Sequence, residues 1–189
     1  FQSLCTNTTG TKNTAIGQCA LSSNTTASNN TAVGVESLRD NTTGTSNTAH
    51  GYRALLNNTT ASNNTAVGYE SLKCNTTSSD NTVVGYASLC SNTTGTANTA
   101  IGSLSLRDNT TGGGNNAFGK NALLVNTTGA DNIALGSDTL RSNVSSSRNI
   151  AIGSSALFES SGTGATYNNA ISQQQTWDLS LHLGFRTWF

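Results

Sequence analysis

The sequence predicts an all-β protein, a parallel β-solenoid in which each repeat of 17 residues forms one rung of a rod. Three observations predict it: an uninterrupted period, turn-forming residues at fixed places in each unit, and a surface poor in charge. Asn, Thr and Gly at this density exclude a helical repeat. The Asn residues that open the nine units are Asn13, Asn30, Asn47, Asn64, Asn81, Asn98, Asn115, Asn132 and Asn149.

Each unit contains two segments that favour β-structure. The consensus is N-T-A-V-G-Y-E-S-L-x-x-N-T-T-G-x-x, numbered here as positions 1–17, with invariant Gly at position 5, Leu at position 9 and Asn at position 12. T-A-V-G and x-S-L-x predict two short strands per rung, and N-T-T-G predicts a turn. Stacked rungs lie about 4.8 Å apart. The Asn residues of positions 1 and 12 are therefore expected to form side-chain ladders.

The expected core is thin. Position 4 is apolar in every unit except at His50, and position 9 is always Leu, so both are predicted to point inward. Two large side chains per rung stabilise a single rod poorly. We therefore expect a homo-oligomer, most simply a parallel trimer, packed through Ala of position 3 and Gly of position 5.

The repeat predicts a β-roll over residues 1–160 and a different segment over 161–189. After Leu157 the phase slips by two residues, and 168–172 resembles a degraded last rung. An amphipathic strand follows. We expect it to act as a cap or to contact the first rung of another subunit, stacking oligomers head to tail. The candidate intersubunit residues are Phe1, Trp177, Leu179, Leu181, Leu183, Phe185, Trp188 and Phe189. Because the chain begins at Phe1 without Met, we expect a processed chain or part of a longer one.

Composition excludes several classes of function. Only 10% of the 189 residues are charged, and nine Lys and Arg balance nine Asp and Glu. No basic surface for nucleic acid is expected. No apolar run reaches the roughly 18 residues of a transmembrane helix.

The charges follow a second period of 34 residues. Cations occupy position 10 on every other rung, and three of these four rungs carry an acid at position 7. Like charges on adjacent rungs would repel, so the spacing is interpreted as structural rather than as a row of ligand-binding residues. The cations are Arg39, Lys73, Arg107 and Arg141, and the acids are Glu36, Glu70 and Asp138.

The four cysteines lie in two pairs on adjacent rungs. We predict the disulfides Cys5–Cys19 and Cys74–Cys90, and from them an oxidising, extracellular location. No C-x-x-C pair or Cys/His cluster suggests a metal site, and no cofactor is expected.

Position 12 is also an N-x-[S/T] sequon on every rung. In a secreted eukaryotic or viral protein these Asn residues are possible glycosylation sites, whereas the structural interpretation is an Asn ladder. The candidates are Asn7, Asn24, Asn41, Asn58, Asn75, Asn92, Asn109, Asn126 and Asn143.

Tyr52, Tyr69 and Tyr86 occupy position 6 on successive rungs. Such a column can bind a glycan or a receptor, or it can simply stabilise the sheet. The two histidines, His50 and His182, belong to no recognisable catalytic set. No enzymatic activity is expected.

Two families resemble this repeat. The segment N-T-A-V-G-Y-E-S-L, as at residues 64–72, resembles the repeats of trimeric autotransporter adhesin heads of the YadA-like type. Phage tail-fibre-like arrays are still more similar, as at 47–51 and 98–102. The resemblance implies a left-handed parallel β-roll, an intertwined trimer and an attachment function at a virion or cell surface.

The expected function is therefore an extracellular structural fibre or adhesive shaft that binds copies of itself and a cell-surface glycan or protein receptor. The alternative is an ice-binding β-solenoid, because Thr columns over 8–127 and 14–99 resemble ice-binding arrays.

Overall fold

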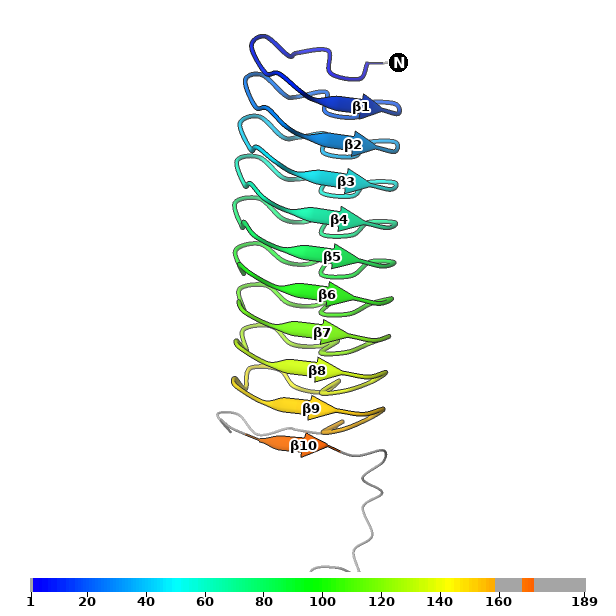
Figure 1. The fold of residues 1–189 in the computed structure, drawn as a ribbon, viewed down its shortest axis with the longest axis vertical. Coiled ribbons are helices and arrows are strands. Elements are labelled where there is room, and N and C mark those ends of the chain that lie inside the picture. Colours follow the sequence, from blue (N-terminus) through cyan, green and yellow to red (C-terminus); the bar gives the residue numbers. More distant parts are fainter. Residues whose placement is uncertain (1, 159–167, 172–189) are drawn as a thin grey trace, which may run out of the picture.

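The computed structural model describes residues 2–158 and 168–171 as a straight stack of rungs (Figure 1). Ten three-residue strands form one sheet, and each pairs in parallel with the next along the chain. The described part is thus an all-β parallel β-solenoid without helices. The strands are β1 (Thr14–Ile16), β2 (Thr31–Val33), β3 (Thr48–His50), β4 (Thr65–Val67), β5 (Thr82–Val84), β6 (Thr99–Ile101), β7 (Asn116–Phe118), β8 (Ile133–Leu135), β9 (Ile150–Ile152) and β10 (Asn169–Ile171).

The register places equal positions of the repeat above one another. In β2 and β3, for example, Ala32 pairs with Ala49. The step is 17 residues as far as β9, and β10 also pairs in parallel with β9. Asn168 stands 19 residues after Asn149 and donates both its backbone and its side-chain N–H to the Asn149 Oδ1 at 3.1 Å. The last described rung thus contains the expected slip of two residues.

Each rung has one strand rather than the two that were predicted. The segment around the invariant Leu forms turns, because positions 7 and 9 have left-handed backbone angles, as at Glu70 (φ 51°) and Leu72 (φ 52°). A left-handed residue cannot continue an extended strand. The segment still bonds between rungs: the Leu72 N–H donates to the Ser88 carbonyl at 3.0 Å.

The glycine of position 5 allows the chain to turn immediately after each strand. Gly68 has φ +134°, and a Cβ atom there would collide with the backbone carbonyl of Gly85 on the next rung. Only glycine combines this angle with so close an approach.

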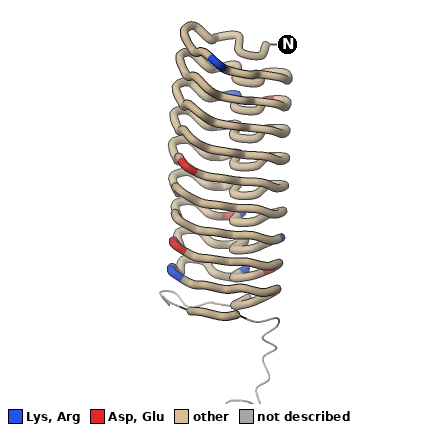
Figure 2. The backbone as a smooth tube through the Cα atoms, in the orientation of Figure 1, with Lys and Arg blue, Asp and Glu red and all other residues tan. Residues whose placement is uncertain are grey.

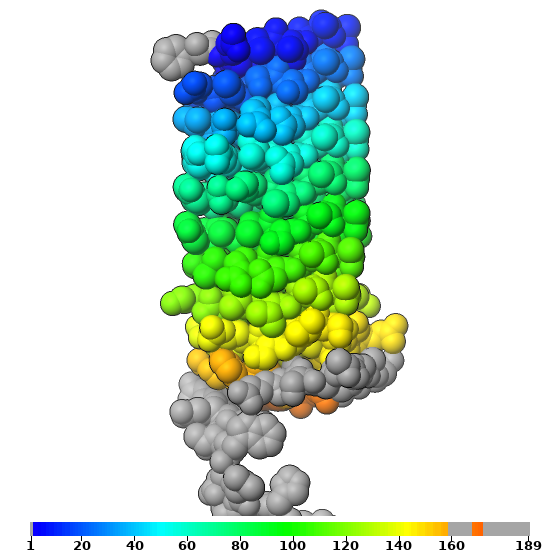
Figure 3. Space-filling model, turned by 180° about the vertical axis from the view of Figure 1, so that it is seen from behind, coloured from blue at the N-terminus to red at the C-terminus, as the bar shows by residue number. Residues whose placement is uncertain are grey.

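The core differs from the prediction. Alanine of position 3 and leucine of position 9 point inward, and Ala66 and Leu72 are both completely buried. Position 4 was expected inside but lies on the outside, because side chains alternate along a strand and position 3 takes the inner place. Position 3 is therefore also unavailable for contacts between subunits. Viewed from behind, the rod keeps a nearly uniform width along its length (Figure 3).

Candidate functional site

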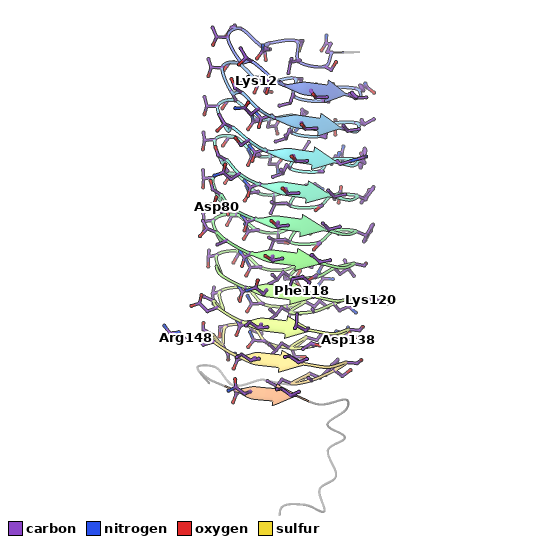
Figure 4. The ribbon with its side chains drawn as sticks, viewed as in Figure 1. Lys12, Asp80, Phe118, Lys120, Asp138 and Arg148 are labelled. Carbon is purple, nitrogen blue, oxygen red and sulfur yellow. The ribbon has the colours of Figure 1, made fainter. Side chains whose placement is uncertain are left out.

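The outer side chains of the strands form a continuous surface, called here the strand face, made by positions 2 and 4 of β1–β10. Position 2 is Thr on six successive rungs, and position 4 is apolar except at His50. Ile16 is 60% exposed and Phe118 is 37% exposed. The strands carry no charged residue, and Figure 2 shows the charges on turns and behind the strands. Phe118, labelled in Figure 4, lies on the stack of strands, at the end of β7.

The outward orientation of position 4 could have been read from the sequence. Position 3 is Ala in every unit except at Val83, whereas position 4 varies from Val to His and Phe. A packed interior restricts side-chain size, and a surface does not. The larger size and hydrophobicity of position 4 suggested burial more strongly than its variability suggested exposure.

The three tyrosines of position 6 form a stack on the rod surface. The ring centroids of Tyr52 and Tyr69 are 5.1 Å apart, and those of Tyr69 and Tyr86 are 5.4 Å apart, with interplanar angles of 25° and 15°. Tyr69 is 45% exposed and Tyr86 is 56% exposed. Because the rings face one another along the rod axis, their edges and hydroxyl groups face the solvent. The inner ring faces of the stack are already occupied.

Arg53 caps one end of this stack. Its guanidinium carbon lies 4.8 Å from the Tyr52 ring centroid. Its Nε donates to Oε2 of Glu36 on the preceding rung at 2.6 Å, which directs the side chain toward that rung. Hydrogen bonding to Arg53 lowers the pKa of Glu36, and the same bond raises the pKa of Arg53.

The charged columns of positions 7 and 10 are joined by ion pairs. On three rungs the cation of position 10 pairs with the acid of position 7 of the same rung. These pairs are Arg39–Glu36 at 3.5 Å, Lys73–Glu70 at 2.9 Å and Arg141–Asp138 at 3.4 Å. Between rungs, Arg53 lies between Glu36 and Glu70 at 2.6 and 4.0 Å. The charges therefore neutralise one another locally, and these columns form a structural network.

The asparagines of position 12 form a ladder inside the rod. Each Nδ2 from Asn24 onward donates to the Asn Oδ1 of the preceding rung at 2.7–3.2 Å. The same nitrogen also donates to the carbonyl three residues later, and every member except Asn7 is buried. N-glycosylation would use this same nitrogen, which in the folded rod is buried and hydrogen-bonded in eight of the nine sequons. A second ladder runs through position 1, where the Asn81 N–H donates to the Asn64 Oδ1 at 3.0 Å.

The threonine column over 8–127 is also used internally. The Thr59 hydroxyl, for example, donates to the Thr76 carbonyl of the next rung at 3.1 Å. Seven of the eight hydroxyl groups in this column donate to the backbone in this way.

All four cysteines are free thiols, so the predicted Cys5–Cys19 and Cys74–Cys90 disulfides are absent from the structure. The paired rungs are adjacent, because the Cys74 N–H donates to the Cys90 carbonyl at 3.0 Å. The thiols nevertheless point along the rod: Cys5 Sγ lies 3.4 Å from the Ser22 carbonyl, and Cys90 Sγ lies 3.8 Å from the Arg107 carbonyl. Cys90 thus faces the rung beyond it rather than the rung of Cys74.

Several remaining predictions concern residues outside the described ranges. They concern His182 and the candidate intersubunit residues Phe1 and 177–189. His50 is exposed on the strand face. Within the described ranges, no three His, Cys, Asp or Glu side chains are grouped closely enough to hold a metal ion. The same part of the chain has no helix able to cross a membrane.

Comparisons with protein-family models, with curated proteins and with solved structures find no match to this chain.

Proposed function

We propose that the chain is the subunit of an extracellular structural fibre or adhesive shaft without enzymatic activity, and that its rods associate side by side through the strand face. The observation that carries this proposal is the uncharged strand face with its nearly uninterrupted apolar column. Contiguous exposed apolar surface of this kind marks interaction sites.

The repeat makes the strand face complementary to itself. Six successive rungs offer a Thr at position 2, and every rung except that of His50 offers an apolar side chain at position 4, at a spacing of about 4.8 Å. A second copy has the same spacing, so contacts made at one rung recur at the others. Three rods around a common axis would cover all three strand faces, which is the trimer expected from the thin core.

The rigidity of the rod also suits a structural fibre or shaft. Asn ladders run the length of the rod, and neighbouring rungs are joined by backbone bonds on both sides of the strand. A solenoid of this type transmits load along its axis through many equivalent contacts.

The mass of the assembly tests the proposal. We expect light scattering after size exclusion to give three protomers, and the double variant Val67→Lys/Ile101→Lys to give monomers with unchanged β-sheet circular dichroism. Val35→Lys is the matched control, because Val35 is exposed at position 6, outside the strand face. A monomeric native protein, or association unaffected by the double variant, would refute the proposal.

A second candidate function is ice binding. It is favoured by the adjacent outward rows in β1–β6, one of Thr and one of Val or Ile that only His50 interrupts. Both functions need the same strand face, but ice binding needs it uncovered in solution. Thermal hysteresis in a monomeric native protein would support ice binding, whereas a trimer without hysteresis would exclude it.

A further inference from the structure

The tyrosine stack has two different ends. Arg53, held by Glu36, covers the Tyr52 end. At the other end no ring follows Tyr86, because position 6 of the next rung is Ser103. Exposure of the rings matches this difference, since Tyr86 is the most exposed of the three.

Backbone bonds place Ser103 directly beyond the open face of Tyr86. Gly102 and Leu104, its two neighbours, donate to the carbonyls of Val84 and Tyr86 at 2.8 and 2.9 Å. The rung after Ser103 is placed in the same way. Gly119 and Asn121 donate to the carbonyls of Ile101 and Ser103 at 2.8 and 3.0 Å, which puts Lys120 in line.

Tyr86, Ser103 and Lys120 therefore bound a step, called here the Tyr86 step, that is two rungs or about 9.6 Å deep. Ser103 is too small to fill it. Stacked rings in contact need about 4.5–7 Å between centroids. The step thus has room for one flat ring as a fourth member of the stack.

The side chains around the Tyr86 step favour one class of ring as the ligand. The face of an aromatic ring is negatively polarised and attracts C–H groups, which a pyranose sugar presents on its flat side. The Ser103 hydroxyl can both donate to and accept from sugar hydroxyl groups. Lys120 is exposed, and no carboxylate in the described part of the chain pairs with it. Asp138, near Lys120 in Figure 4, is already bonded to Arg141 and Asn121.

We infer that the Tyr86 step binds one acidic sugar residue of a glycan, its ring stacked on Tyr86 and its carboxylate facing Lys120. The inference rests on the proposed adhesive role and names its ligand class. It does not depend on association, because position 6 lies outside the strand face.

The test compares 3′-sialyllactose and trigalacturonate with neutral lactose, by saturation-transfer NMR and calorimetry on the native protein. Both acidic probes are expected to bind, lactose at least about fivefold more weakly, with a preference that falls as salt rises. Tyr86→Ala should weaken binding by about five- to tenfold, the loss of one stacking contact. Lys120→Gln should remove the preference for the acidic probes.

Ser103→Tyr is the decisive variant, because it fills the step with a fourth tyrosine without removing any existing contact of Tyr86. It should abolish binding while leaving the melting temperature unchanged or higher. Val35→Ala, at the capped end of the same column, is the matched control and should bind like the native protein.

Undiminished binding by Ser103→Tyr, equal affinity for sialyllactose and lactose, or no binding of any probe at millimolar concentration would each overturn the inference. Light scattering of the same samples reports association separately. A monomer that binds acidic sugars would contradict the proposed trimer alone, and a trimer that binds none would contradict the Tyr86 step alone.

Discussion

Asn75 joins two rungs and closes its own turn with a single nitrogen: its Nδ2 donates to Asn58 Oδ1 at 2.9 Å and to the Ser78 carbonyl at 2.8 Å. Its own Oδ1 accepts from Asn92 Nδ2 at 3.2 Å. The residue is completely buried, so no water replaces these partners. The rungs from Asn24 to Asn126 repeat the arrangement, which accounts for the invariance of Asn at position 12.

Replacing Asn75 with Ala should lower the free energy of unfolding by about 1–3 kcal/mol, because it leaves buried polar groups without partners. Urea unfolding followed by circular dichroism measures the change. Thr77→Ala is the control, since Thr77 is exposed on the same turn and should shift stability by less than about 0.5 kcal/mol. Equal effects of the two substitutions would contradict the structural role of the ladder.

Ala97→Gly should stabilise the rod by about 0.5–1 kcal/mol. Ala97 is exposed and has φ 57°, a left-handed angle that costs non-glycine residues roughly 1–2 kcal/mol, more than the backbone entropy that glycine loses. Gly114 occupies the same column at φ 70°, so Gly114→Ala should destabilise. Thermal unfolding compares both.

Ala130→Gly serves as the control, because Ala130 lies one column away without a positive φ. At Ala130 glycine has no conformational advantage and loses more backbone entropy on folding than alanine, so Ala130→Gly should destabilise by about 0.5–1 kcal/mol. The same sign of effect at Ala97 and Ala130 would show that the left-handed angle is not what matters.

The Glu36–Arg53 pair should make stability depend on acid pH. Arg53 lowers the pKa of Glu36 below its ordinary value of about 4.5. The contribution is therefore complete above that pH and is lost as the pH falls through the lowered pKa. Because the pair is open to solvent, water and salt screen it and its contribution should be small.

Glu36→Gln should consequently be less stable than the native protein near neutral pH and equal to it at strongly acid pH. Urea midpoints measured across this range at low salt give the comparison. Asp131→Asn, which changes an exposed carboxylate in another column, should not reproduce this convergence. A difference that persists unchanged into acid would argue against the ion pair.

The thiols should differ in reactivity. Burial raises the pKa of the Cys90 thiol, and its side chain is partly covered, whereas Cys5 is exposed. At neutral pH, iodoacetamide should alkylate Cys5 well before Cys90, and the Cys90 rate should rise with pH as thiolate forms. Peptide mass spectrometry under non-reducing conditions follows both sites. Linked peptides joining 74 to 90 in native material would contradict the free thiols.

The amino-acid sequence alone determined the period, the parallel stacking of equal positions and both Asn ladders. An insertion-free repeat requires each residue to lie over its own equivalent, and Asn is suited to bond with itself across a rung. It also indicated the tyrosine column and the alternation of charge, because both depend only on which rung carries which residue.

The tertiary structure decided which side chains point inward and where the chain turns. Ala66 and Leu72 fill the interior of their rung, and Val67, which follows Ala66 on the strand, points to the outside because side chains alternate. Leu72 adopts a left-handed angle because burial of its side chain and the bond to Ser88 outweigh the local preference. Such a choice is made by the neighbouring rungs together, and for that reason the turns around Leu72 and the direction of the thiols could not be read from the repeat.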